Sequence, residues 1–284
     1  MAIQSLDNMM ASISAGKYNK AVFQKSSVNA AASAAGRWHE FFTANGIPWA
    51  GAFSGTAGVA TQMTGATQGA LNVGPTSVTP DIKHLLNLKA QSPTATLVPT
   101  TMYLVDFLLY YPSCVVTGTA TTLNNTATLP RYTDGAGVSA FIAVQTTLGA
   151  TQPVLTLSYT DQDGNTGNTA LAMTSPVASA QLSTLFLNNG SPFLPLAGAD
   201  TGVRKIDSYT LATGTTGTVA MVLCKVLAEI DVYAINTGVR VDHLAMVPSL
   251  PKIEDGACLG FIGVAGGSMA TNSAFSGSLD VVWG

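Results

Sequence analysis

The residues that could perform acid–base chemistry are few and scattered in this 284-residue chain. Its three histidines are His39, His84 and His243, and their spacing matches no metal site. Asp242 directly precedes His243, but a nucleophilic serine on a strained turn would require a GxSxG motif, which is absent. We interpret His243 as a surface or interface residue. The sequence therefore predicts no catalytic residue, and we expect a protein without enzymatic activity.

Carboxylates offer two further candidate sites. The glutamates are Glu40, Glu229 and Glu254, and because paired carboxylates can meet in space, their spacing neither excludes nor favours a glycosidase site. The run 161–165 (Asp-Gln-Asp-Gly-Asn) resembles the start of a calcium loop. A calcium loop needs a bidentate glutamate at its twelfth position, which is Ala172 here, so a turn is the better interpretation.

Cysteine and glycine patterns indicate no bound group. Cys114, Cys224 and Cys258 are far apart and form no CxxC motif, so we interpret them as buried free thiols in a reducing compartment. The glycines of segment 263–267 are not followed by Lys-Ser or Lys-Thr, which argues against a phosphate loop. We expect neither a metal nor a cofactor.

The chain is unusually poor in charge. It has 12 basic and 15 acidic residues, which is 10% of the chain, whereas soluble domains average about 25%. Such a surface promotes association, so the composition favours a subunit of an assembly. A net charge of −3 argues against a nucleic-acid binder. The apolar run 102–116 is interrupted by Asp106 and Pro112 and is shorter than the ~20 residues of a membrane span, so no membrane partner is expected.

Residues 1–80 are predicted to form an extended N-terminal arm with short helices. Residues 1–16 carry apolar side chains at helical spacing and end at Gly16, and residues 29–44 could hold a second short helix. Segment 47–80 is rich in Gly, Ala and Thr, so we expect residues 1–80 to become ordered only on neighbouring subunits and to be trimmed by protease in the isolated protein. Pro80 and Asp81 suit the start of a short helix over 81–91.

Residues 92–284 are predicted to form a β-sandwich. Apolar alternation, β-branched runs and turn signals indicate short strands, with a hairpin around the turn Asp163-Gly164. The expected strands are 101–111, 138–147, 153–160, 166–173, 203–212, 218–228, 230–235, 258–264 and 279–283. The fold class is therefore mainly β, an antiparallel β-sandwich or jelly-roll-like domain.

Three sequence patches resemble those of one protein family. They are the AGRW patch running from Ala34 to Pro48, the turn patch 159–167, and the DTGVR patch 199–206. In this order they resemble head-associated structural proteins of tailed bacteriophages. The resemblance spans most of the chain and transfers no catalytic residue.

The resemblance implies a virion structural protein, with a capsid decoration (cement) protein as the first interpretation. Its partners would be the major capsid protein and copies of itself, with a homotrimer as the first choice, in a virion assembled in the host bacterial cytoplasm. The major capsid protein itself is the alternative, although such proteins carry a long charged helix that this sequence lacks. A tail-tube or collar subunit and a glycan-binding spike are further alternatives.

Five residues of the arm are predicted to contact other subunits. Arginine and large aromatic residues are over-represented at the centres of interfaces, which singles out Arg37, Trp38, Phe41, Phe42 and Trp49. Trp38 could instead be a core residue. In an interface role, Trp38→Ala would weaken incorporation into particles and leave the melting temperature of the monomer nearly unchanged.

Overall fold

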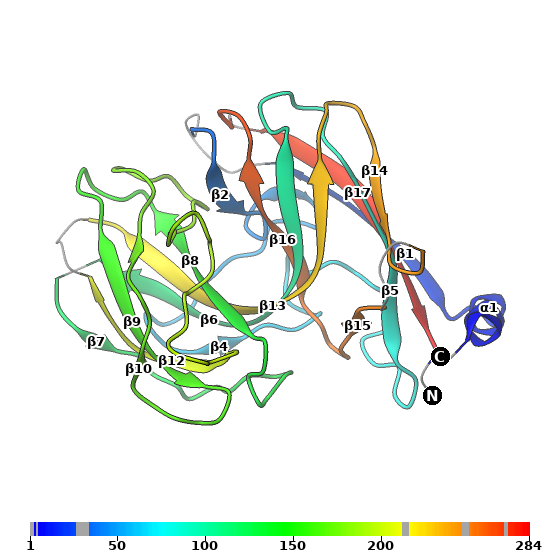
Figure 1. Ribbon diagram of the computed structural model, residues 1–284, viewed down its shortest axis with the longest axis horizontal. Helices are drawn as coiled ribbons and strands as arrows, with labels where there is room; N and C mark the ends of the chain where they lie inside the picture. Colours follow the sequence, from blue (N-terminus) through cyan, green and yellow to red (C-terminus); the bar gives the residue numbers. More distant parts are fainter. Residues whose placement is uncertain are drawn as a thin grey trace.

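The computed structural model describes residues 3, 5–26, 34–116, 118–211, 216–245, 250–269 and 272–284. These residues form three sheets and a single helix, α1 (Leu6–Ser14). All pairs of strands within the sheets are antiparallel. The prediction of a mainly β, antiparallel sandwich is confirmed (Figure 1).

Sheet B runs through the whole molecule. Its strands in spatial order are β2 (Arg37–Glu40), β16 (Leu259–Ala265), β6 (Thr100–Val115), β13 (Thr218–Val232) and β8 (Ser139–Thr146), with β4 (Thr61–Gln62) paired to β6. The runs that form β6 and β13 are rich in β-branched and aromatic residues, which favour extended backbone. Figure 1 shows β13 curving from one lobe of the molecule into the other.

Sheets A and C pack against different parts of sheet B. Each forms one lobe of the molecule together with the part of sheet B that it covers. Sheet A contains, in spatial order, β14 (Val239–Asp242), β5 (Lys83–Gln91), β17 (Ala274–Trp283), β1 (Tyr18–Ser26) and β3 (Asn45–Ile47), with β15 (Lys252–Ile253) paired to β5. Sheet C contains β10 (Asn168–Thr169), β9 (Val154–Asp161), β12 (Val203–Leu211) and β7 (Thr121–Thr122), with β11 (Met173–Thr174) paired to β9.

The three larger clusters of the hydrophobic core follow this arrangement. Leu104 of β6 packs in the core under sheet A, and Leu109 of the same strand packs in the core under sheet C. Val105 and Phe107 point to the opposite face of sheet B, where the segment after β2 covers them. Since burial of each large apolar side chain stabilises by about 1.5–3 kcal/mol, both faces of sheet B contribute to folding.

The helix predicted over residues 81–91 is wrong, because Lys83–Gln91 form strand β5 between β14 and β17. The error has a physical cause. Leu85 pairs with Val281 and Asn87 pairs with Asp280, so Leu86 is an extra residue that forms a bulge. The bulge places Leu85 and Leu88, which are three positions apart, in the same core, and this spacing imitates a helix.

The separate N-terminal arm predicted for residues 1–80 is also wrong for the described residues. β1 pairs with β17 along its whole length, and β2 pairs with β16. The first part of the chain is therefore built into the same sheets as the last part. The second predicted helix, over 29–44, is wrong at the strand Arg37–Glu40, and its residues 29–33 lie outside the described residues.

The first predicted helix is confirmed as α1, with Ser5 as its N-cap and Gly16, at φ 77°, just after its end. It packs through Met9 against Leu86 of β5 and Val282 of β17, near the C-terminus (Figure 1). Among the described residues, no helix has the length and apolar character needed to cross a lipid bilayer.

Candidate interaction surface

Trp38, which was expected at a subunit contact, is buried within its own chain. Its side chain is 8% exposed, and its ring stacks on Tyr103 with 5.3 Å between ring centroids and an interplanar angle of 9°. The indole Nε1 donates a hydrogen bond of 3.1 Å to the carbonyl of Gly190. The core interpretation of Trp38 therefore holds. Arg37, beside it on β2, is half-buried.

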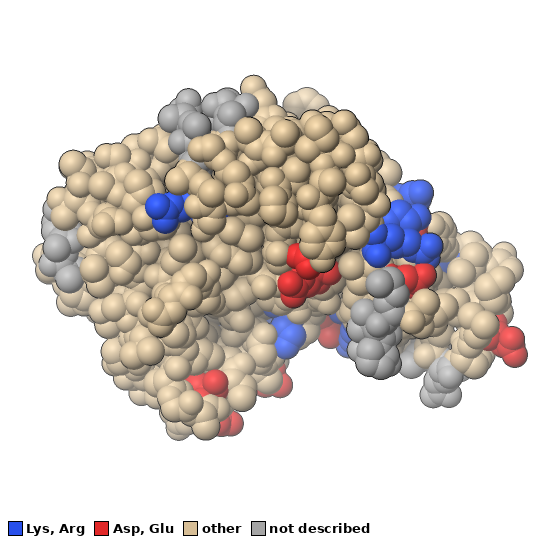
Figure 2. Space-filling view, turned by 45° about the horizontal axis from the view of Figure 1, so that its top comes forward, with Lys and Arg blue, Asp and Glu red and all other residues tan. Residues whose placement is uncertain are grey.

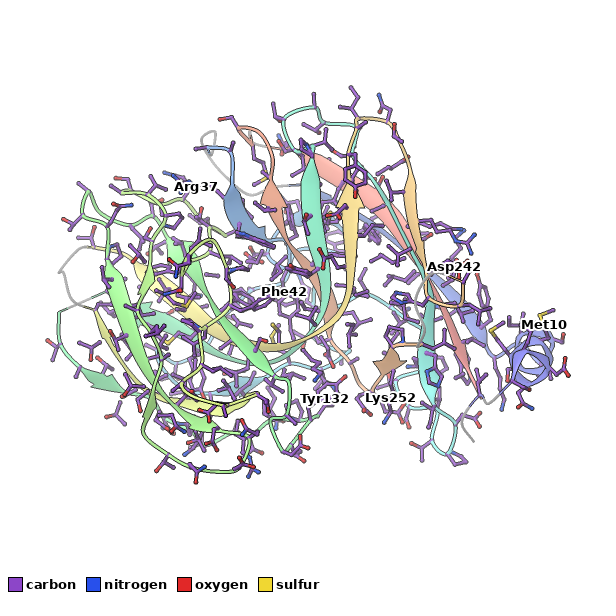
Figure 3. All side chains as sticks on the ribbon, viewed as in Figure 1. Met10, Arg37, Phe42, Tyr132, Asp242 and Lys252 are labelled. Atoms are coloured by element: carbon purple, nitrogen blue, oxygen red, sulfur yellow. The ribbon has the colours of Figure 1, made fainter. Side chains whose placement is uncertain are left out.

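Phe41 and Phe42 are also buried in the chain. Phe41 meets Phe275 edge to face at 4.7 Å, and Phe42 lies 5.2 Å from the rings of both Phe53 and Phe107. Figure 3 shows Phe42 near the middle of the molecule, between the two lobes. The prediction that Phe41 and Phe42 contact other subunits is wrong, because both rings are buried in the core of their own chain.

Trp49 is the one aromatic residue of the predicted set that faces solvent, with 80% of its side chain exposed. The backbone that carries it is held by Lys25, a buried residue of β1. The Lys25 ammonium donates to the carbonyls of Ala44, Pro48 and Trp49, at 3.1, 2.8 and 3.4 Å. Burial lowers the pKa of Lys25 to about 8, and the charge of Glu40 opposes this shift. The loop that presents Trp49 is thus tied to β1 at three points.

Two more apolar side chains lie exposed on β1 and β3, the strands next to the Trp49 loop. Val22 of β1 is 58% exposed and Ile47 of β3 is 54% exposed, and both line a hollow of about 290 Å³ together with Pro48. We call Val22, Ile47 and Trp49 the edge surface, because β3 is the last strand on this side of sheet A. Lys20 is the one charged residue that lines the hollow.

The rest of the molecular surface is unevenly charged. Figure 2 shows a broad face with almost no Lys, Arg, Asp or Glu, while the charged residues in that view gather along its lower and right-hand borders. Exposed apolar patches mark sites of protein interaction, and a surface with few charged residues promotes association. The edge surface and the uncharged face are therefore suited to contact with other proteins.

The histidines considered for catalysis do not form a site. His39 lies on β2 in sheet B, and His243 follows β14 in sheet A. His243 is buried, with 4% of its surface exposed, so the prediction that it lies at the surface is wrong. Burial lowers the pKa of His39 to about 3, and the charge of Arg37 contributes to the shift. Among the described residues, no group of three or more His, Cys, Asp and Glu is arranged to hold a metal ion.

The run Asp161–Asn165 is a turn, as predicted. The Asp161 carboxylate accepts hydrogen bonds from the backbone amides of Asp163 and Asn165 and from the side-chain amides of Asn165 and Asn168. The three cysteines are buried free thiols, also as predicted. The structure further brings the turn patch next to the DTGVR patch, since Gln162 Oε1 accepts from the amides of Thr201 and Gly202.

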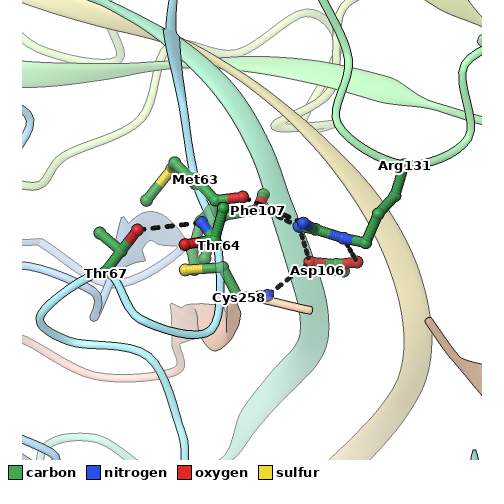
Figure 4. Close-up of polar contacts among 7 residues, drawn as sticks. All are labelled: Met63, Thr64, Thr67, Asp106, Phe107, Arg131 and Cys258. Atoms are coloured by element: carbon green, nitrogen blue, oxygen red, sulfur yellow. Dashed lines mark hydrogen bonds and ion pairs between the residues drawn. The ribbon is translucent and has the colours of Figure 1, made fainter. Parts of the chain in front are cut away.

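A buried ion pair that the sequence did not predict joins the two lobes. Asp106 lies on β6 between Leu104, in the core under sheet A, and Leu108, in the core under sheet C. Arg131 donates to both carboxylate oxygens of Asp106, at 2.7 and 2.8 Å, and to the carbonyls of Met63 and Phe107 (Figure 4). The amide of Cys258 donates to the same carboxylate at 2.8 Å.

These contacts tie four separate segments of the chain together, and we call Asp106 and Arg131 the clamp. Asp106 itself could have indicated a buried ion pair, because a carboxylate within an apolar strand needs a buried cation and hydrogen-bond donors. The sequence did not indicate which of the basic residues would supply that cation.

Comparisons with known proteins place this chain in no family. No family model matches the chain, and no curated protein matches its sequence. Among solved structures, the VP2 subviral particle of infectious bursal disease virus aligns at 11% identity over 93% of this chain and 80% of that chain, with a TM-score of 0.20. A mutant VP2 of the same virus, in T=1 particles, aligns at 8% identity over 93% and 77%, with a TM-score of 0.20. The similarity to these viral capsid proteins is weak, and at such TM-scores we draw no conclusion from it.

Proposed function

We propose that this protein is a non-enzymatic structural subunit of a virion, and specifically a cement protein on the head of a tailed bacteriophage. The exposure of Trp49 is the observation that carries the proposal. An indole fixed by backbone contacts but left in solvent is suited to a partner surface, because tryptophan is among the residues that contribute most to protein interfaces. The resemblance of the three sequence patches supports the choice of virion.

The mechanism of such a protein is mechanical. The edge surface offers three apolar side chains, and burial of each would contribute about 1.5–3 kcal/mol before the cost of association. One such contact is weak. A shell presents many equivalent positions, and simultaneous contacts through the edge surface and the uncharged face would raise the effective affinity. Each subunit would thereby bridge neighbouring shell proteins and resist their separation.

The cement role is favoured over that of the major capsid protein by the helix content. The resemblance implies that shell proteins carry a long charged helix, whereas α1 is nine residues long and is the one helix of the described residues. We therefore propose that the partners are the major capsid protein and further copies of this chain, with a homotrimer as the first choice. The location would be the capsid of a virion assembled in the host bacterial cytoplasm.

The test is to mix the purified protein with phage shells that lack it. We expect saturable binding and greater resistance of the loaded shells to heat or to a chelator. Shells that remain bare at saturating protein concentration would overturn the cement role. Turnover of a polysaccharide by the purified protein would overturn the non-enzymatic assignment.

A further inference from the structure

A second surface, on sheet C, has the properties of a small-molecule site. It is a hollow of about 480 Å³, which lies within the range of about 300–1,000 Å³ typical of ligand pockets. Three parts of the chain line it: the loop between β7 and β8, the turn after β9, and the start of β12. The lining residues used below are Ala127, Thr128, Leu129, Thr133, Gly164, Thr166, Arg204 and Lys205.

The wall formed by the turn is rigid. Gln162 joins it to the segment before β12, as described above, and its carbonyl accepts from Arg204 Nε at 3.1 Å and Nη2 at 2.6 Å. Arg204 Nε also donates to the carbonyl of Asp134, at 3.1 Å. Three contacts to carbonyl oxygens therefore fix the guanidinium before any ligand arrives, which reduces the entropy lost on binding.

The charge of Arg204 is not neutralised within the described chain. Its recorded partners are neutral carbonyls, and no carboxylate of the described residues lies within ion-pair distance of it. Its Nη1 makes no recorded hydrogen bond and lies 3.6 Å from the position that a Cβ would take on Gly164. Since Gly164 carries no side chain, the end of the guanidinium remains uncovered at the pocket wall.

The nearby carboxylates already have donors of their own. Asp161 accepts the four N–H bonds of its turn, and Asp163 accepts from the side chain of Gln162 at 2.8 Å. Asp207 forms an ion pair with Lys205 at 3.3 Å and accepts from Thr160. The guanidinium of Arg204 is consequently the charged group that can still form an ion pair with a ligand, and a planar guanidinium pairs best with a planar carboxylate.

The remaining lining suits a ring that carries hydroxyl groups. The hydroxyls of Thr128, Thr133 and Thr166 have no recorded hydrogen bond among the described residues and can exchange water for a ligand. Ala127 offers an apolar area for C–H groups beside the buried Leu129. We propose that this pocket binds a carboxylated saccharide, with the carboxylate on Arg204 and the ring hydroxyls on the threonines. A small carboxylate alone would leave most of the pocket unfilled.

The proposal is tested by titrating the full chain with sodium glucuronate and measuring the changes in NMR chemical shifts or the heat of binding. Glucose and sodium acetate are the matched probes, since each lacks one half of the proposed ligand. We expect saturable binding of glucuronate, with glucose and acetate at least about tenfold weaker. Arg204→Gln should weaken glucuronate binding roughly ten- to hundredfold, the range expected for loss of hydrogen bonds to a charged group. Arg240→Gln, which alters an exposed ion pair on β14, should leave the affinity unchanged.

Thr166→Val provides a second variant, because Arg204 also stabilises the turn. It removes an exposed hydroxyl that has no recorded partner and should weaken binding without changing the melting temperature. Lack of saturation by glucuronate, equal binding of acetate or glucose, or unchanged affinity of both variants would overturn the proposal. Binding of the Arg204→Gln protein to phage shells should stay normal, so failure of this proposal is distinguishable from failure of the cement role.

Discussion

At the scale of single residues, two tryptophans of the same N-terminal segment have opposite surroundings. Trp38 stacks on Tyr103 and donates to Gly190, whereas Trp49 is fixed through its backbone and leaves its ring in solvent. The difference arises from coverage of the two edge strands, because the amide of Leu185 donates to the carbonyl of Trp38 on β2 at 2.9 Å, while Trp49 follows the short edge strand β3. The buried Trp38 is therefore expected to contribute to stability, while the exposed Trp49 is available to a partner.

Trp38→Ala should destabilise the isolated chain by about 3–5 kcal/mol, the usual cost of truncating a buried tryptophan. Equilibrium unfolding in denaturant measures this loss. The result would reverse the expectation drawn from the sequence, in which the melting temperature stayed nearly unchanged. A loss below about 1 kcal/mol would show that the indole is not part of the core.

His39 should make the chain sensitive to acid. Its pKa is about 3 in the folded chain against 6.5 for the ordinary group, so the unfolded chain takes up the proton first as the pH falls. The stabilisation is complete above pH 6.5 and is lost progressively toward pH 3, by up to about 1.4 kcal/mol per pH unit. Unfolding free energies at several pH values should therefore fall less steeply for His39→Gln than for the wild type.

Two neighbouring groups bear on that experiment. Burial raises the pKa of Glu40, which acts in the opposite direction, so the comparison of variant and wild type is needed to isolate His39. His84→Gln is the control, because His84 is only half-buried and should change the slope less. Identical slopes for His39→Gln and the wild type would contradict the assignment of His39 as a buried neutral base.

At the scale of elements, strands were predictable where the side-chain pattern was undisturbed. The runs 138–147 and 153–160 match β8 and β9 closely, because alternation and turn residues agree there. The two strands expected at 218–228 and 230–235 are one strand, β13, since bulges let it curve across both lobes without ending. β5 was mistaken for a helix because its bulge alters the apolar spacing.

The candidate sites were less predictable than the strands. The sequence singled out Trp49 together with four other residues, of which Trp38, Phe41 and Phe42 are buried and Arg37 is half-buried. Burial depends on which distant strand covers a segment, and local composition does not contain that information. The Gly- and Ala-rich segment 47–80 illustrates the point, because Phe53, Met63 and Leu71 are buried against sheets B and A, whereas Ile47 and Trp49 of the same segment are exposed.

Limited proteolysis of the isolated chain should leave segment 47–80 intact. The burial of Phe53, Met63 and Leu71 holds it against the sheets, and cleavage requires local unfolding of the backbone. Mass spectrometry of the fragments identifies the cut sites. Rapid cleavage within 47–80 of a proven monomer would instead support the earlier expectation that this segment becomes ordered only on assembly.

At the scale of the whole molecule, the clamp connects the two cores under sheets A and C. Asp106 of β6 and Arg131 of the loop before β8 lie between the cores under sheets A and C, and their further partners are Phe107 of β6, Met63 just after β4 and Cys258 just before β16. The two lobes also share the strands β6 and β13. We therefore expect them to unfold together.

Arg131→Met should destabilise the whole chain by about 3–5 kcal/mol, because it leaves the Asp106 carboxylate buried without a cation. Calorimetry should show a single transition at a lower temperature. Lys252→Met is the matched control, since it removes an exposed ion pair with Glu254 and should cost less than about 1 kcal/mol. Two separate transitions in the wild type would contradict the coupling of the lobes.

In the proposed cement role, the exposed Trp49 is part of the surface that joins this protein to a phage shell. The most direct test measures binding of Trp49→Ser and of Tyr233→Ser to shells that lack the protein. Tyr233 is the control, because it is also largely exposed but follows β13, outside the edge surface. We predict that Trp49→Ser weakens binding by about 2 kcal/mol or more, close to thirtyfold, with an unchanged melting temperature, while Tyr233→Ser binds as the wild type does. Wild-type affinity of the Trp49→Ser protein would contradict the account.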